Sequence, residues 1–236
     1  MARTTSMPRK KVKDFGTCLY FAGSGDYVEF TQSDLSGWNG EVSVSFFVWI
    51  TEIIASDRPI VDSMWGSDSS GGFQFLVYNG KLVNCKIGDT EGSDTVSGDS
   101  ADLTKKWHHV VFTKSVLNGR QRVYVDNVLK GTNSSLSYGA TPLNDGVVLR
   151  IMERRTGGGG AAGYVDDFRI YNRELSNEEI ERLYLFHDIS SGLVHHFKFD
   201  EETGLLVTDS AGNATGSIVG AAAYSNNVPC KSRNSV

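Results

Sequence analysis

Apolar and polar residues alternate with a period of two along most of this 236-residue chain. The segment VSVSFFVWI (42–50) is the clearest case, because every second residue from Val42 to Ile50 is apolar. Successive side chains of a β-strand point to opposite faces of its sheet, so this segment is predicted to be a strand with one apolar face. Similar runs lie at 18–22, 27–31, 73–78, 81–87, 107–113, 122–126, 147–151, 164–171 and 193–199.

Turn residues separate these runs. The Asn-Gly dipeptides at 79–80 and 118–119 suit the left-handed backbone of tight hairpins. One helical pattern stands out at 175–184, where Ser176 and Glu179 have the spacing of a capping box. Many short strands joined by hairpins, with a single short helix, predict an antiparallel all-β sandwich or barrel.

Charge divides the chain into a basic arm and an acidic body. The first 13 residues hold five basic side chains and no acid, which leaves 18 Lys and Arg against 28 Asp and Glu, a net charge of −10 for the remainder. Nucleic-acid binding requires a basic surface, so we do not expect the body to bind nucleic acid. The arm is interpreted either as a solvated tail or as a segment that touches phosphate, RNA or an acidic protein face such as that of a capsid. Its basic residues are Arg3, Arg9, Lys10, Lys11 and Lys13.

Several common signals are missing from the sequence. No apolar run approaches the roughly 20 residues that cross a bilayer, and no apolar region follows the positive start as in a signal peptide. The three cysteines are widely spaced and form no zinc or disulfide pattern. Cys18 and Cys85 fall within strand patterns and are predicted to be small core residues.

A family resemblance emerges from the run GYVDDFRIYNRELSNEEIERLY (163–184), which resembles the closing signature of laminin-G-like, concanavalin A-like jelly-roll domains. This resemblance implies an antiparallel β-sandwich with one short helix. Five upstream segments match the family in the same order: LYFAGSGDYVEF (19–30), VSVSFFVWI (42–50), GGFQFLVYNGKLV (71–83), WHHVVFTK (107–114) and RVYVDNVLKG (122–131).

The segment GLVHHFKFDEETGLLVTDSAGNATGSIVGAAAY (192–224) resembles the first strands of the same family, although here it comes last. We therefore expect a circularly permuted domain in which these residues complete the sandwich. The alternative is strand exchange, in which they complete a neighbouring protomer. The predicted organisation is an arm at 1–17, a sandwich at 18–225 and a tail at 226–236.

The sequence offers no catalytic residues. Enzymes on related folds carry paired carboxylates on one strand, whereas Asp166 and Asp167 are adjacent and are predicted to point to opposite faces. The histidine pairs at 108–109 and 195–196 are divided in the same way, so core or hydrogen-bonding roles are expected for them.

The resemblance also implies one structural Ca²⁺ ion, held by Asp26 together with Asp166 or Asp167. Ala22 departs from the family pattern, in which an aspartate is more usual, so one ligand oxygen is absent. In the alternative interpretation, Asp26 caps a turn and one of the paired aspartates binds the backbone.

The candidate ligand-binding residues lie in two polar loops. Trp65 and Asp68 belong to the glycine-rich loop 64–72, where an aromatic ring is suited to stacking on a sugar. Arg154 and Arg155, together with the glycine run that follows them, are predicted to form a second, mobile rim. The alternative is that Trp65 packs into the edge of the sandwich. Trp49 and Trp107 are assigned to the core because the family usually packs these positions internally.

Three functions follow in order of preference. The first is a non-enzymatic recognition or adhesion module that binds glycan or protein through its loops and one sheet face. The second is a structural or decoration protein of a virus (phage) particle, anchored by the arm, and the third is a glycoside hydrolase or lyase. The expected location is a virion surface or the extracellular space, and the identity of the ligand and the oligomeric state stay open.

Overall fold

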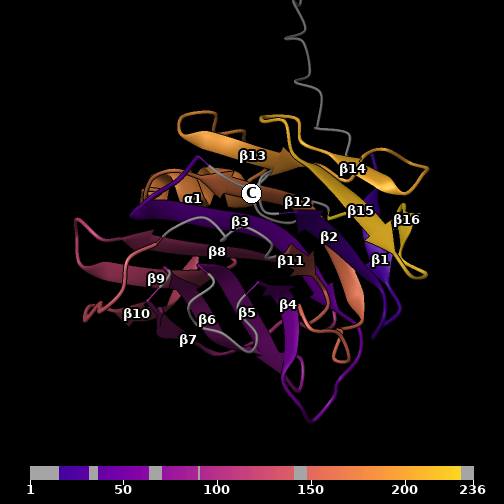
Figure 1. The fold of residues 1–236 in the computed structure, drawn as a ribbon, viewed down its shortest axis with the longest axis horizontal. Helices are drawn as coiled ribbons and strands as arrows, with labels where there is room; N and C mark the ends of the chain where they lie inside the picture. The colour runs from indigo at the N-terminus through magenta and orange to yellow at the C-terminus, as the bar shows by residue number, and fades with distance from the viewer. Residues whose placement is uncertain (1–15, 32–36, 64–70, 90, 141–147, 230–236) are drawn as a thin grey trace, which may run out of the picture.

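The computed structural model describes residues 16–31, 37–63, 71–89, 91–140 and 148–229, which form two packed antiparallel sheets and one helix (Figure 1). Sheet A runs in the order β10 (Val128–Asn133), β9 (Arg120–Val125), β8 (His108–Ser115), β3 (Glu41–Ile50), β12 (Gly163–Tyr171), β1 (Cys18–Phe21) and β16 (Ala223–Ser225), with β13 (Leu193–Phe197) also paired to β12. Sheet B runs in the order β14 (Leu206–Thr208), β15 (Thr215–Val219), β2 (Tyr27–Thr31), β11 (Val148–Ile151), β4 (Arg58–Asp62), β5 (Gly72–Tyr78), β6 (Lys81–Gly88) and β7 (Ser93–Asp102). This arrangement confirms the predicted β-sandwich.

The main core lies between the inner faces of the two sheets. Every second residue of β3 from Val42 to Ile50 belongs to it, as the alternation predicted. Phe46 reaches across the sandwich, with its ring centre 5.9 Å from that of Phe75 in sheet B. Cys85 belongs to the same core and is fully buried, which confirms its predicted role.

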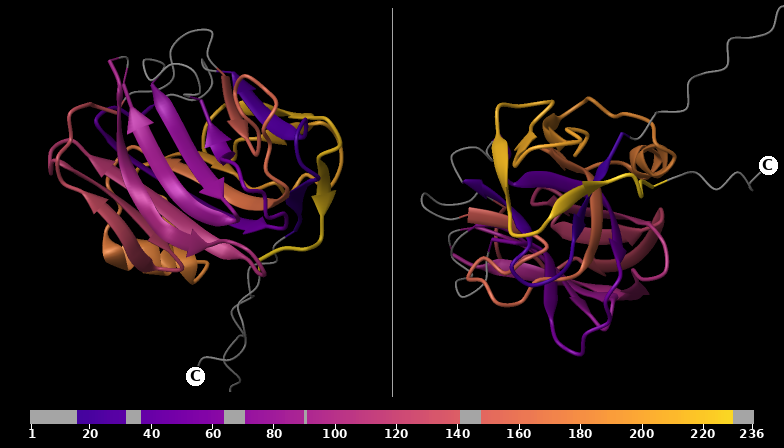
Figure 2. Two further views of the ribbon diagram at one scale, coloured as in Figure 1. Left: turned by 90° about the horizontal axis from the view of Figure 1, so that it is seen from below. Right: turned by 90° about the vertical axis from the view of Figure 1, so that its right-hand side faces the viewer.

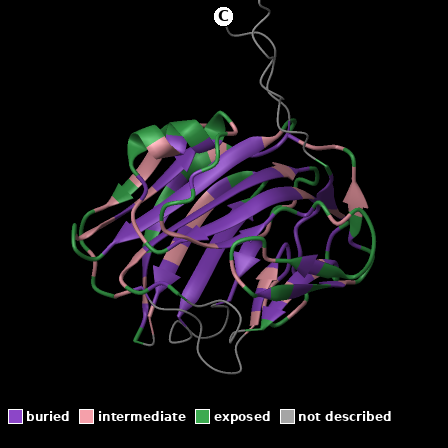
Figure 3. Ribbon diagram, turned by 90° about the horizontal axis from the view of Figure 1, so that it is seen from above, coloured by how far each residue is buried: buried purple, intermediate pink, exposed green. Residues whose placement is uncertain are grey.

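The helix α1 (Asn177–Tyr184) covers part of the outer face of sheet A, and only its outward side is exposed (Figure 3). The predicted capping box is present: the Glu179 backbone N–H donates to Ser176 Oγ at 3.3 Å, and the Ser176 N–H donates to Glu179 Oε2 at 3.0 Å. Beneath the helix lies a second, smaller apolar cluster. Its members are Val111, Tyr124, Tyr171, Leu175, Ile180, Leu183 and Ile189.

The last four strands join both sheets of their own chain. β13 pairs with β12, β14 and β15 extend sheet B beside β2, and β16 pairs with β1. Figure 2 shows these orange and yellow strands beside the indigo strands from the start of the chain. Phe197 and Phe199 are fully buried in the main core. That these strands correspond to the family's first strands, and that the domain ends where proposed, stay predictions.

Within the residues that the structure describes, no helix has the length and apolar character needed to cross a membrane.

Candidate functional site

The loop that carries Trp65 and Asp68 lies mostly outside the described residues. Its described borders are Ser63, whose N–H donates to Phe73 O at 2.9 Å, and Gly71, whose N–H donates to Asp89 O at 3.3 Å. The predicted sugar platform on this loop therefore stays a prediction. The five basic residues of the arm also lie outside the described residues, so anchoring to an acidic partner stays a prediction as well.

Arg154 and Arg155 lie in a loop. Hydrogen bonds to buried carboxylates attach this loop to sheet B. The Glu153 side chain accepts hydrogen bonds from the Gly25 N–H at 2.7 Å and from the Arg154 N–H at 2.8 Å. The Arg155 N–H donates to Asp62 Oδ2 at 2.9 Å, and Asp62 is fully buried at the end of β4. These bonds hold the loop in place, and ligand binding by either arginine stays a prediction.

Two of the three predicted calcium ligands, Asp26 and Asp167, have other partners. Asp26 accepts hydrogen bonds from the backbone N–H groups of Ala22 at 2.9 Å and Ala221 at 2.6 Å, so it caps one turn and ties it to another. Asp167 forms an ion pair with Arg169. Among the described residues, no group of three or more acidic, histidine or cysteine side chains is arranged to hold a metal. Calcium binding stays a prediction.

A β-bulge changes the geometry expected for the paired aspartates. The register between β12 and β3 shifts between Asp166 and Arg169, and Asp167 has a left-handed φ of 54°. Val165 and Phe168 both face the core. In a regular strand a single residue separates two core-facing residues, whereas here two residues, Asp166 and Asp167, lie between them. Asp167 contacts the outward Arg169, and Asp166 contributes to raising the pKa of the Cys18 thiol, after burial, to about 12. We conclude that both carboxylates lie on the outer side of sheet A, and that the prediction of opposite faces was wrong.

The histidine pairs have the hydrogen-bonding roles that the sequence predicted. All four rings are buried, and each bonds to an oxygen of another side chain. The pairs are His108 with Asp126 at 2.8 Å, His109 with Ser45 at 2.9 Å, His195 with Asp209 at 2.7 Å and His196 with Asp167 at 2.5 Å.

The burial of His109 predicts acid sensitivity. Burial lowers the pKa of His109 to about 3, whereas an unfolded histidine titrates near about 6.5. Between these pH values only the unfolded chain takes up this proton, so stability falls as the pH falls below about 6.5, by up to about 1.4 kcal/mol per pH unit. In urea unfolding, His109→Gln should reduce this slope between about pH 6 and pH 4. His187 is exposed, so His187→Gln is the control that should leave the slope unchanged. An unaltered slope in His109→Gln would contradict the assignment.

Four aromatic rings form a half-buried cluster on the outer face of sheet A, which we call the aromatic cluster: Tyr20, Trp49, Trp107 and Tyr164. Tyr164 lies at its centre, with ring centroids 4.9 Å from Tyr20, 5.5 Å from Trp49 and 5.9 Å from Trp107. The assignment of Trp49 and Trp107 to the core was therefore wrong. Trp49 occupies an outward position of the β3 alternation, and the apolar residues of α1 pack against a different set of outward residues.

The segment after β16 borders the aromatic cluster. Trp107 Nε1 donates to Asn227 O at 2.9 Å, and Cys18 Sγ donates to the same oxygen at 3.4 Å.

The position of Trp49 on the outer face could have been predicted from the alternation of β3. No sequence signal indicated that four rings from separate segments of the chain would meet.

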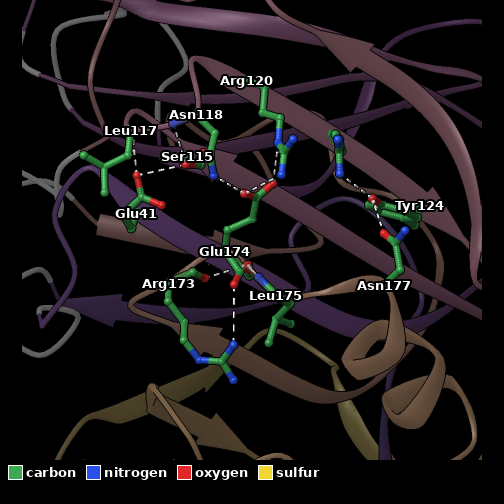
Figure 4. Close-up of polar contacts among 12 residues, drawn as sticks. Glu41, Ser115, Leu117, Asn118, Arg120, Tyr124, Arg173, Glu174, Leu175 and Asn177 are labelled. Carbon is green, nitrogen blue, oxygen red and sulfur yellow. Dashed lines mark hydrogen bonds and ion pairs between the residues drawn. The ribbon is translucent and has the colours of Figure 1, made fainter.

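A shallow pocket lies between β9 and the segment that leads into α1 (Figure 4). We call it the β9 pocket; its volume is about 310 Å³. Its walls combine guanidinium donors with carboxylate and amide acceptors, which suits a polar ligand. The lining residues are Arg120, Arg122, Glu174, Leu175, Ser176 and Asn177.

The two antiparallel sheets with a covering helix define a jelly-roll β-sandwich of the lectin-like type. The family model of the concanavalin A-like lectin/glucanases superfamily matches residues 22–181, and the chain belongs to that superfamily.

Individual relatives share the fold at low sequence identity. A protein from Bacteroides ovatus that is assigned to carbohydrate binding is 14% identical, with a TM-score of 0.64 over 87% of this chain and 60% of that one. A heptameric SAP-like pentraxin from Limulus polyphemus is 16% identical, with a TM-score of 0.57 over 88% of this chain and 97% of that one.

Part of a bacterial toxin is similar to this chain in sequence. Botulinum neurotoxin type D, from Clostridium botulinum D phage, is 24% identical over 148 residues, which are 60% of this chain and 11% of the toxin. The receptor binding domain of botulinum neurotoxin D is 18% identical, with a TM-score of 0.54 over 71% of this chain and 43% of that one. This chain thus spans only about a tenth of the toxin's length.

Proposed function

We propose that the protein is a non-enzymatic recognition module that binds a glycan through the aromatic cluster. The observation that carries this proposal is the grouping of two indole and two phenol rings, all half-buried, on one side of sheet A. Such rings offer apolar faces for stacking, while their polar atoms take part in hydrogen bonds. Relatives assigned to carbohydrate binding and to receptor binding support the same class of function.

A hydrolytic function has less support from the carboxylates of β12. Asp166 is 1% exposed and Asp167 is 8% exposed, so a substrate has little access to them. Asp167 is also held in an ion pair by the Arg169 guanidinium. A glycosidase needs one carboxyl group that gives up a proton to the leaving sugar.

Substitution of the aromatic cluster tests glycan binding. A glycan array first identifies a bound sugar, and titration of that sugar then compares variants. Trp49→Ala and Tyr164→Ala should each weaken binding about tenfold or more, which corresponds to ~1.4 kcal/mol. Trp49→Phe retains an aromatic ring and should keep most of the affinity.

Tyr78 provides the matched control. It is 42% exposed on β5 of sheet B, so Tyr78→Ala removes a surface aromatic ring on the other sheet. Unchanged affinity in this variant is the expected result, and circular dichroism should show that every variant is folded at the temperature of the titration. Full affinity in Trp49→Ala and Tyr164→Ala, or an array without any bound glycan, would refute the proposal.

A further inference from the structure

Strand β9 presents three polar side chains to the outer face of sheet A. Val123 and Val125 point into the core, so the alternation places Arg120, Arg122 and Tyr124 together on the other side. The segment that leads into α1 lies opposite this row, and the β9 pocket lies between them.

The two outer members of the row are engaged across the pocket (Figure 4). Arg120 donates from Nε and Nη2 to the two oxygens of Glu174 at 2.9 and 3.0 Å. Tyr124 OH donates to Asn177 Oδ1 at 3.0 Å. These contacts hold both ends of the pocket in place.

The middle member, Arg122, has much weaker contacts. Its Nη1 is 3.4 Å from Tyr124 OH, and its buried Nε has no acceptor among the residues that the structure describes. Charged hydrogen bonds of arginine are normally shorter and bidentate, as they are for Arg120 in the same strand. Arg122 is therefore a guanidinium at the pocket with donors left to use.

The nearby acidic groups are already compensated. Glu174 is held by Arg120 and by Asn118 Nδ2, the latter at 2.8 Å. Glu179 accepts two bonds of 2.7 Å from Arg173. Among the residues that the structure describes, this leaves the charge of Arg122 without a carboxylate partner at the pocket.

We propose that the β9 pocket binds an acidic sugar, with Arg122 pairing its carboxylate. A guanidinium matches a carboxylate in shape and forms two parallel hydrogen bonds to it. The Glu174 carboxylate and the Asn177 amide supply hydrogen-bond acceptors for the hydroxyl groups of a sugar. A simple anion has no hydroxyl groups to donate to them. The volume of about 310 Å³ is at the lower end for ligand pockets and suits a single sugar ring.

Three probes separate the parts of this proposal. Glucuronate carries both the carboxylate and the ring hydroxyls, glucose lacks the charge, and acetate lacks the ring. Titration of the full chain, followed by NMR chemical shifts at low ionic strength, should give glucuronate an affinity at least about tenfold higher than either of the others. Glucuronate binding no tighter than that of glucose, or matched by acetate, overturns the proposal.

Substitution of Arg122 identifies the residue responsible. Arg122→Gln should raise the Kd of glucuronate about tenfold, whereas the exposed Arg182, in the last turn of α1, is the control and Arg182→Gln should not. Unchanged melting temperatures establish that both variants are folded. Equal glucuronate affinity in Arg122→Gln and the unsubstituted protein contradicts the role of Arg122. The Trp49 and Tyr164 variants should keep glucuronate binding, so failure at one site is separable from failure at the other.

Discussion

A chain that lacks residues 190–236 is expected not to form a stable monomer. The deletion removes β13 to β16, which leaves one edge of β1, one edge of β2 and one edge of half of β12 unpaired. It also opens the main core, because Phe197 and Phe199 are both fully buried there. Loss of a buried phenylalanine alone costs about 3–5 kcal/mol, which is comparable with the whole stability of a typical domain. Size-exclusion chromatography and circular dichroism should show an aggregated or unfolded product.

Removal of residues 230–236 alone is the control, since it leaves the sixteen strands of the described residues intact. A soluble, fully stable product of the larger deletion would disprove the inference that the last strands complete the sandwich. The mass of the intact protein in solution separates the two versions of that inference. A monomer fits self-completion, and a dimer with exchanged strands fits the alternative.

Replacing Lys114 with methionine is expected to lower the free energy of unfolding by about 3–5 kcal/mol. Lys114 is fully buried near the end of β8, and its Nζ donates to Asp94 Oδ2 and to Ile87 O, both at 2.9 Å. Burial lowers the pKa of Lys114, and the bond to Asp94 partly offsets that effect. Without the ammonium group, the Asp94 carboxylate would stay buried without its counter-charge. Denaturant unfolding measures the difference.

Two further variants test whether the loss of stability comes from the unpaired buried charge rather than from loss of a lysine side chain as such. Lys114→Met combined with Asp94→Asn removes both charges, so the pair should cost less than the sum of the single substitutions. Lys81 is exposed on β6, and Lys81→Met should change stability by no more than about 0.5 kcal/mol. A Lys114→Met variant within about 1 kcal/mol of the original protein would refute the assigned role.

Local patterns in the sequence predicted much of the fold. The two faces of β3 followed from strict alternation, since Val42 to Ile50 had to bury one side. The start of α1 followed from the capping box of Ser176 and Glu179, which needs only residues three apart. Both signals are short in range and depend on the backbone period rather than on partners elsewhere in the chain.

Features that depend on distant partners could not be predicted. Lys114 falls at an inward position of β8, where a lysine is tolerated only because Asp94 comes from another sheet. The bulge at Asp167 breaks the period of two, and an aspartate with a left-handed backbone carries no distinctive sequence signal. The β9 pocket likewise requires β9 and Asn177 to meet, although they are far apart in the chain.

The pairing of β1 with β16 has a consequence for synthesis on the ribosome. Leu19 lies opposite Tyr224, so the first strand of the sandwich must wait for its last strand to be translated. Sheet A therefore closes only after nearly the whole domain has left the exit tunnel. Until then one edge of β1 is unpaired, and unpaired strand edges are prone to pair with other chains. Contacts of such long sequence separation also slow folding, so we expect the pairing of β1 with β16 to be a late step in folding.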